Sequence, residues 1–119
     1  MKTVILDASF ILTCIKNKID FFEYLNLGGY QILVPEQVVI EIEGISKSKP
    51  EAKLALKLIK INKPKTIKLQ GKNTDNAIIN YAKKNPDAVI ATLDREIKRK
   101  IKNYKIGIRN KKKLEVSDK

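Results

Sequence analysis

Short apolar runs alternate with amphipathic stretches along the chain. Runs of strand length predict five strands, at Thr3–Leu6, Gln31–Val34, Thr66–Leu69, Ala88–Ala91 and Lys105–Ile108, with a further edge strand at Leu114–Val116. Helical periodicity and stop signals predict six helices between them, at Ala8–Ile15, Asp20–Leu27, about 36–45, Glu51–Ile61, Asn73–Lys83 and Arg95–Asn103. Strands that alternate with helices indicate an α/β fold with a parallel sheet and helices on both faces.

Two apolar stripes predict which helix faces pack on this sheet. Leu54, Leu58 and Ile61 recur at i, i+4 and i+7 in one helix, and Ile97, Ile101 and Tyr104 do so in another. We expect the second set to face the core, with stacking on a base as the alternative for Tyr104. The first helix is expected to cover the sheet, or to form a lid or a dimer surface. The basic residues of the second helix, Arg95, Lys98, Arg99 and Lys102, then fall on its exposed side.

Composition narrows the chemistry. The 119 residues fit one domain, 1–119, whose basic end at 110–119 would form an edge strand and a tail. The chain has no histidine, which excludes His-based catalysis, and its single cysteine, Cys14, excludes a disulfide and a Cys-cluster zinc site. No apolar run approaches the roughly 20 residues of a membrane span, so we expect a cytoplasmic protein.

Charge is concentrated in one half of the chain. Residues 1–60 hold 8 basic and 7 acidic residues, whereas residues 61–119 hold 17 and 6, and the net charge is +12. A polyanion, nucleic acid in the first place, is the partner that this asymmetry favours. The alternative is a solvated face that keeps the protein soluble.

Four acids stand where strands end or helices pack. Asp7 follows the first strand and Asp94 the fourth, Asp75 lies in the first turn of its helix, and Glu41 lies beside Val38 on its helix. Taken singly, Asp7 and Asp94 are good helix N-caps, and Asp75 suits the helix dipole.

Taken together, these acids suggest a metal site. In a parallel sheet Asp7 and Asp94 emerge at the same edge, and they converge if their strands are neighbours. Clustered carboxylates are tolerated when a divalent cation neutralises them, and oxygen ligands favour Mg²⁺ or Mn²⁺. Such a site next to a basic surface is suited to cleaving phosphodiesters.

The segments "VILDASF", "VPEQVVIEIEGI", "TDNAIINYA" and "VIATLDREIKRKI" together resemble the PIN-domain nucleases over nearly the whole chain. The resemblance implies a three-layer α/β/α sandwich with strand order 3-2-1-4-5. It also implies that Asp7, Glu41, Asp75 and Asp94 hold one or two Mg²⁺ or Mn²⁺ ions for endonucleolytic cleavage of RNA, with Ser9 and Thr92 as supporting hydroxyls. A homodimer is a further implication of the family.

The basic stretch after Asp94 indicates a branch of the family. "DREIKRK" resembles the D-R-x-L-K-R-R pattern of PIN proteins in rRNA processing, with Ile97 and Lys100 replacing Leu and Arg, and Asn76 standing where a second acid is common. The compact length is shared with toxin nucleases of toxin–antitoxin modules. The expected protein partner is accordingly an assembly factor or an antitoxin. A catalytically silent RNA-binding scaffold is the third possibility, although it would not need to retain four clustered acids.

Overall fold

The computed structural model describes residues 2–118 and contains one six-stranded sheet of order β3-β2-β1-β4-β5-β6. The strands are β1 Thr3–Leu6, β2 Gln31–Pro35, β3 Lys65–Ile67, β4 Val89–Ala91, β5 Lys105–Arg109 and β6 Lys113–Ser117. The first five are parallel, and β6 pairs antiparallel to β5. The predicted order 3-2-1-4-5 is confirmed, with the edge strand added at its end.

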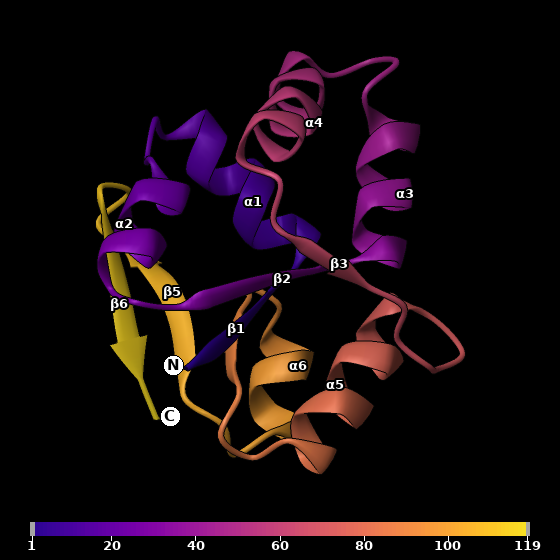
Figure 1. The fold of residues 1–119 in the computed structure, drawn as a ribbon, viewed down its shortest axis with the longest axis vertical. Coiled ribbons are helices and arrows are strands. Elements are labelled where there is room, and N and C mark those ends of the chain that lie inside the picture. The colour runs from indigo at the N-terminus through magenta and orange to yellow at the C-terminus, as the bar shows by residue number, and fades with distance from the viewer. Residues whose placement is uncertain (1, 119) are drawn as a thin grey trace.

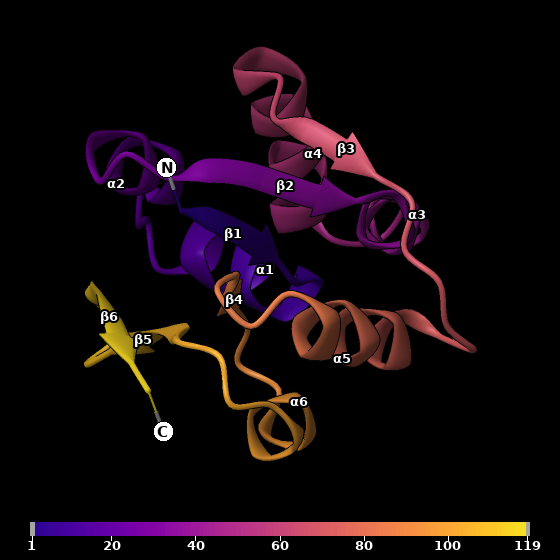
Figure 2. The ribbon, with the colours of Figure 1, turned by 60° about the horizontal axis from the view of Figure 1, so that its bottom comes forward.

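The helices form a layer on each side of the sheet. They are α1 Ala8–Lys16, α2 Phe21–Leu27, α3 Glu36–Ile45, α4 Pro50–Asn62, α5 Thr74–Lys84 and α6 Arg95–Lys100. Figure 1 shows α1, α3 and α4 above the strands and α5 and α6 below them. Figure 2, turned by 60°, shows β1, β2 and β3 running in the same direction between these layers. The predicted three-layer α/β/α sandwich is therefore present.

The centre of the sheet is β1, which pairs on both sides. Ile5 lies opposite Leu33 of β2 and Ile90 of β4, and the side chains of Val4, Ile5 and Leu6 are fully buried. A parallel strand covered on both faces needs such an unbroken apolar run, because neither of its faces meets water. This central position makes β1 and β4 neighbours, which decides where their carboxyl ends lie.

The apolar stripe of α4 is only partly buried, because Leu58 packs against the core but the two residues at its ends do not. Leu54 is 46% exposed and Ile61 is 64% exposed, whereas the buried side chains of the helix are Ala52 and Ala55. Small residues let two helices approach closely, and α4 packs on both α1 and α3 through this alanine side. Leu54 and Ile61 are therefore left toward solvent.

The helix after Asp94 is shorter than predicted. It ends at Lys100, because Ile101 is already extended and begins the turn toward β5. Ile97 and Ile101 are buried as expected, but Tyr104 is 49% exposed, with Lys2 Nζ 5.0 Å from its ring centroid. Tyr104 is thus not a core residue. The predicted tail includes Lys119, which lies outside the described residues, as does Met1.

No helix within residues 2–118 is long and apolar enough to cross a membrane.

Candidate metal centre at the carboxyl edge of the sheet

Asp7 and Asp94 lie at the same edge of the sheet because β1 and β4 are adjacent and parallel. The pairing extends past the strands, since the backbone N–H of Asp7 donates to the carbonyl of Ala91 over 2.9 Å. Asp7 then begins α1, and Asp94 begins α6. The condition for the predicted convergence, that the two strands are neighbours, is therefore met.

The carboxylate of Asp7 is 5% exposed and is held by three donors. Oδ1 accepts from the backbone N–H of Ala8 over 2.8 Å. Oδ2 accepts from the hydroxyl of Ser9 over 3.1 Å and from that of Thr92 over 2.7 Å. The two hydroxyl groups therefore set the orientation of the Asp7 carboxylate. Within residues 2–118 this carboxylate forms no salt bridge.

Ser9 and Thr92 also fix the loop that carries Asp94. Ser9 Oγ accepts from the backbone N–H of Leu93 over 3.3 Å, and Thr92 Oγ1 accepts from the backbone N–H of Asp94 over 3.1 Å. The hydroxyl oxygen of Thr92 therefore accepts from the backbone of Asp94, while the same hydroxyl group donates to the carboxylate of Asp7. The two supporting hydroxyls lock the Asp7 and Asp94 loops to each other.

Asp94 caps its helix with one oxygen only. Oδ1 accepts from the backbone N–H groups of Glu96 and Ile97 over 2.8 and 3.1 Å. Within residues 2–118, Oδ2 accepts no side-chain or backbone donor. The N-cap interpretation and the metal-ligand interpretation are thus compatible, because they use different oxygens of the same carboxylate.

Glu41 and Asp75 reach the same edge from opposite layers, on α3 and α5, and both are exposed. Surrounding atoms that displace water raise the pKa of Glu41, and repulsion from Asp7 and Asp75 raises it further. The pKa of Asp75 is raised in the same way, first by desolvation and then by Asp94 and Asp7. The four predicted acids therefore form one electrostatically coupled cluster.

The donor set of this cluster fits a hard divalent cation. It consists of carboxylate and hydroxyl oxygens, and the only cysteine, Cys14, is buried with its pKa raised to about 12 by desolvation. As the side chains are placed, residues 2–118 contain no group of three or more acids that could hold a metal ion directly.

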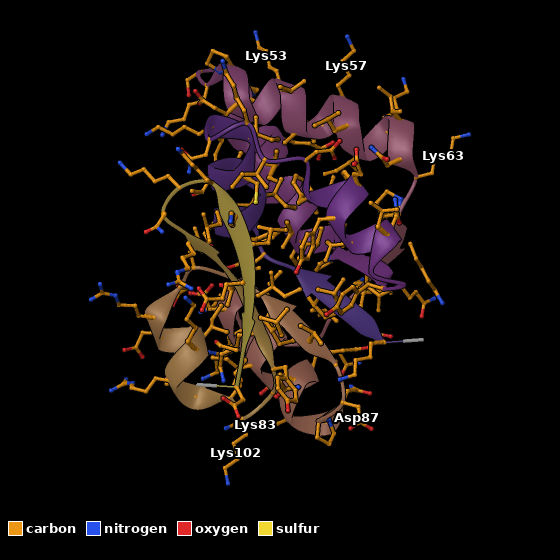
Figure 3. All side chains as sticks on the ribbon, turned by 90° about the vertical axis from the view of Figure 1, so that its left-hand side faces the viewer. Lys53, Lys57, Lys63, Lys83, Asp87 and Lys102 are labelled. Carbon is orange, nitrogen blue, oxygen red and sulfur yellow. The ribbon has the colours of Figure 1, made fainter. Side chains whose placement is uncertain are left out.

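The basic residues predicted on one exposed face of α6 are dispersed. Arg99 is paired with Glu96 through two bonds of 2.7 and 2.9 Å. Lys98 is half-buried and reaches toward Gly107 of β5. Lys102 follows the end of α6, at the edge where the parallel strands begin, and points away from the molecule (Figure 3). Arg95, at the start of the helix, is exposed and lies nearest to Asp94 in the chain.

One residue that positions this edge was not anticipated from the sequence. Gln37 lies in the first turn of α3, where its Nε2 donates to the carbonyl of Leu69 over 2.5 Å and its Oε1 accepts from the N–H of Leu69 over 3.4 Å. These bonds tie the segment after β3 to α3. No local signal identifies such a residue, because its partner lies 32 positions away.

Comparison with known proteins agrees with this fold. The chain matches the family described as "PIN like domain" over residues 4–112. It is 32% identical over 127 residues to Ribonuclease VapC4 of Methanocaldococcus jannaschii, covering 98% of this chain and 97% of that protein. Among solved structures, the PIN domain endonuclease Utp24 superposes with a TM-score of 0.79 at 24% identity, over 98% of this chain and 92% of the other.

Proposed function

The chain belongs to the PIN-like domain family, and from that premise we propose that it is a metal-dependent endoribonuclease. The observation that carries the proposal is that the adjacent parallel strands β1 and β4 bring Asp7 and Asp94 to one sheet edge, where Thr92 is hydrogen-bonded to both residues. The name of the relative, Ribonuclease VapC4, supports RNA as the substrate.

In this proposal Asp7, Glu41, Asp75 and Asp94 hold Mg²⁺ or Mn²⁺. Asp7 is the fixed ligand, because three donors already set its orientation, and Asp94 offers the oxygen that does not cap α6. Glu41 on α3 and Asp75 on α5 are exposed and would complete the ligand set. Such an ion lowers the pKa of a water molecule and stabilises negative charge on a phosphate.

The chain's own residues supply the rest of the site. Ser9 and Thr92 hold the loops of Asp7 and Asp94 together, so that the two carboxylates present a constant separation to the phosphate. Arg95, exposed one residue after Asp94, is placed to contact the RNA backbone, which positions the strand without reading its sequence.

The test is cleavage of single-stranded and structured RNA in the presence of Mn²⁺, Mg²⁺ or a chelator. We expect cleavage to stop in chelator and to fall at least roughly 100-fold in Asp7→Asn and Asp94→Asn, because losing a ligand costs more than the 10–100-fold typical of a residue that supports one. Asp20→Asn is the matched control, since Asp20 also caps a helix, α2, outside the cluster. Binding without cleavage in any metal would instead identify a silent RNA-binding scaffold.

We propose rRNA processing as the cellular role, on the basis of the basic sequence that follows Asp94. The second candidate is a toxin nuclease, which the name of the relative Ribonuclease VapC4 favours. Inducible expression separates them. Arrested growth that Asp7→Asn abolishes and that a co-expressed antitoxin relieves indicates a toxin, whereas unaffected growth together with cleavage of precursor rRNA indicates processing.

A further inference from the structure

The sheet face that carries α5 is left open over β2 and β3. Strand alternation points Gln31 and Leu33 of β2, and Lys65 and Ile67 of β3, to this face. These residues and the inner side of α5 line a groove of about 450 Å³. Figure 1 shows α5 below β1 and β2, and the segment after β3 running past the first turn of α5.

The groove is positively charged. Lys65, Lys68 and Lys84 line it, and no carboxylate does. None of these three lysines takes part in an ion pair within residues 2–118. Like charges on the walls of a concave surface reinforce one another's potential, so the groove is suited to an anion that can span all three positions.

One end of the groove adjoins the acid cluster. Its lining begins on α5 at Ala77, two residues after Asp75, and ends at Lys84, the last residue of the helix. At 1.5 Å per residue this run is about 10 Å long. A polyanion seated here would therefore extend from the carboxyl edge of the sheet toward the edge where the strands begin.

The wall of the groove is held in place by close packing. A Cβ atom on Gly71 would lie 2.6 Å from the backbone nitrogen of Ala77, so only glycine allows the loop to approach α5 this closely. Leu69 is bonded to Gln37, and Asn80 Nδ2 donates to the carbonyl of Gln70 over 3.4 Å. The groove is thus already formed before any ligand binds.

We propose that this groove binds a single-stranded stretch of the RNA next to the phosphate that is cut. The inference rests on the proposed function for the identity of the polyanion. Single strands present phosphates together with unpaired base faces and edges, and the groove offers lysines, the amides of Gln31 and Asn80, and an apolar floor at Leu33 and Ile67. A duplex keeps its base faces stacked inside and leaves that floor unused.

The test compares two triple variants that remove the same charge. In the groove variant Lys65, Lys68 and Lys84 become Gln. In the control variant Lys53, Lys57 and Lys83 become Gln. All three control lysines are exposed, and Figure 3 shows them pointing away from the protein. Lys53 and Lys57 lie on α4, and Lys83 precedes Lys84 on α5. Binding of a single-stranded RNA is measured over a range of salt concentrations, each variant being combined with Asp7→Asn to prevent cleavage. Circular dichroism verifies the fold.

We expect the groove variant to bind at least 10-fold more weakly and its salt slope to fall by about 2, since each phosphate contact to a single strand contributes about 0.7. The control variant should keep the slope of the parent. Equal losses in both variants, or a loss with duplex RNA as large as with single strands, would overturn the inference. So would an acidic peptide that occupies the groove in preference to RNA.

The outcome is independent of catalysis. If the protein binds RNA through the groove but cleaves none, the groove inference holds and the proposed activity fails. If it cleaves RNA and the groove variant retains full affinity, the activity stands and the groove inference fails. An introduced cysteine, Asn80→Cys, provides a direct check by crosslinking to thiolated RNA, because Cys14 is buried and does not compete.

Discussion

At the scale of single residues, Glu41 and Asp75 carry negative charge at an energetic cost. Desolvation and repulsion by the other carboxylates raise the pKa of both in the folded protein. The folded state therefore binds a proton more tightly than the unfolded state does. The stability of the metal-free protein must then fall as the pH rises from the ordinary carboxyl range through these raised values.

This predicts that Glu41→Gln and Asp75→Asn stabilise the metal-free protein at neutral pH. The gain should be absent at acid pH, where the carboxyl groups are protonated in both states, and should grow as the pH rises. Thermal unfolding in chelator between pH 4 and 8 measures it. Glu43→Gln is the control, since it removes the same charge from α3 outside the cluster, and an identical pH profile in Glu43→Gln and Glu41→Gln contradicts the prediction.

The sequence identified these acids but not their bonding. The position of Asp7 and Asp94 directly after strands follows from apolar patterning, and only the resemblance to a family supplied the neighbouring strands that unite them. The bond from Thr92 to Asp7 joins residues 85 positions apart, and Gln37 acts over 32 positions. Such contacts depend on the packed fold and leave no periodic trace in the chain.

At the scale of elements, α5 is joined to β4 and β5 by one buried side chain. Asn103 is 5% exposed, and its Nδ2 lies 3.1, 2.9 and 2.9 Å from the carbonyl oxygens of Ala82, Asn85 and Ala88. These three carbonyls belong to the end of α5 and the turn that leads into β4. One amide therefore fixes how the helix returns to the sheet.

We expect Asn103→Ala to lower the free energy of unfolding by about 1–3 kcal/mol, because it leaves the buried carbonyl of Ala88 without its donor. The carbonyls of Ala82 and Asn85 lose one of two donors, since they also accept from the backbone N–H groups of Asn85 and Ala88. Denaturant unfolding measures the change. Asn62→Ala is the matched control. Asn62 also donates to a backbone carbonyl, that of Leu58 over 2.8 Å, but it is exposed, so water replaces the bond. Equal effects of the two substitutions would argue against burial as the cause.

Element positions were more predictable than their contacts. Apolar runs located every strand to within two residues at each end, because the central strands β1 and β4 are buried on both faces. The spacing of Leu54, Leu58 and Ile61 did not disclose how α4 packs, because its fully buried residues are Ala52 and Ala55, which contact neighbouring elements closely. Periodicity identifies an amphipathic helix but does not measure the space available to it.

At the scale of the whole molecule, the proposed metal site predicts that a divalent cation stabilises the fold. Binding of Mg²⁺ or Mn²⁺ to the folded state alone should stabilise the protein by about 2.7 kcal/mol at a free concentration of 100 Kd. For a domain of this size we expect the Tm to rise by roughly 3–6 °C per kcal/mol. Calorimetry with and without metal measures the shift.

The shift should disappear in Asp7→Asn and persist in Asp20→Asn, whose carboxylate is remote from the cluster. A shift that survives in Asp7→Asn would place the cation elsewhere.

The groove beside α5 is also a feature of the whole molecule. Side chains from β2, β3 and α5 line it, and it exists because α5 does not cover β2 and β3. No single segment of the sequence discloses this arrangement.

The central position of β1 also has a consequence for synthesis of the chain. Asp7 is translated well before its closest partner, Thr92, and Asp94 comes later still. A nascent chain can pair β1 with β2 early, yet the proposed site has no complete set of acids until β4 and Asp94 have been made. A growing chain bound to the ribosome, itself built of RNA, therefore lacks the assembled site until that point of its synthesis.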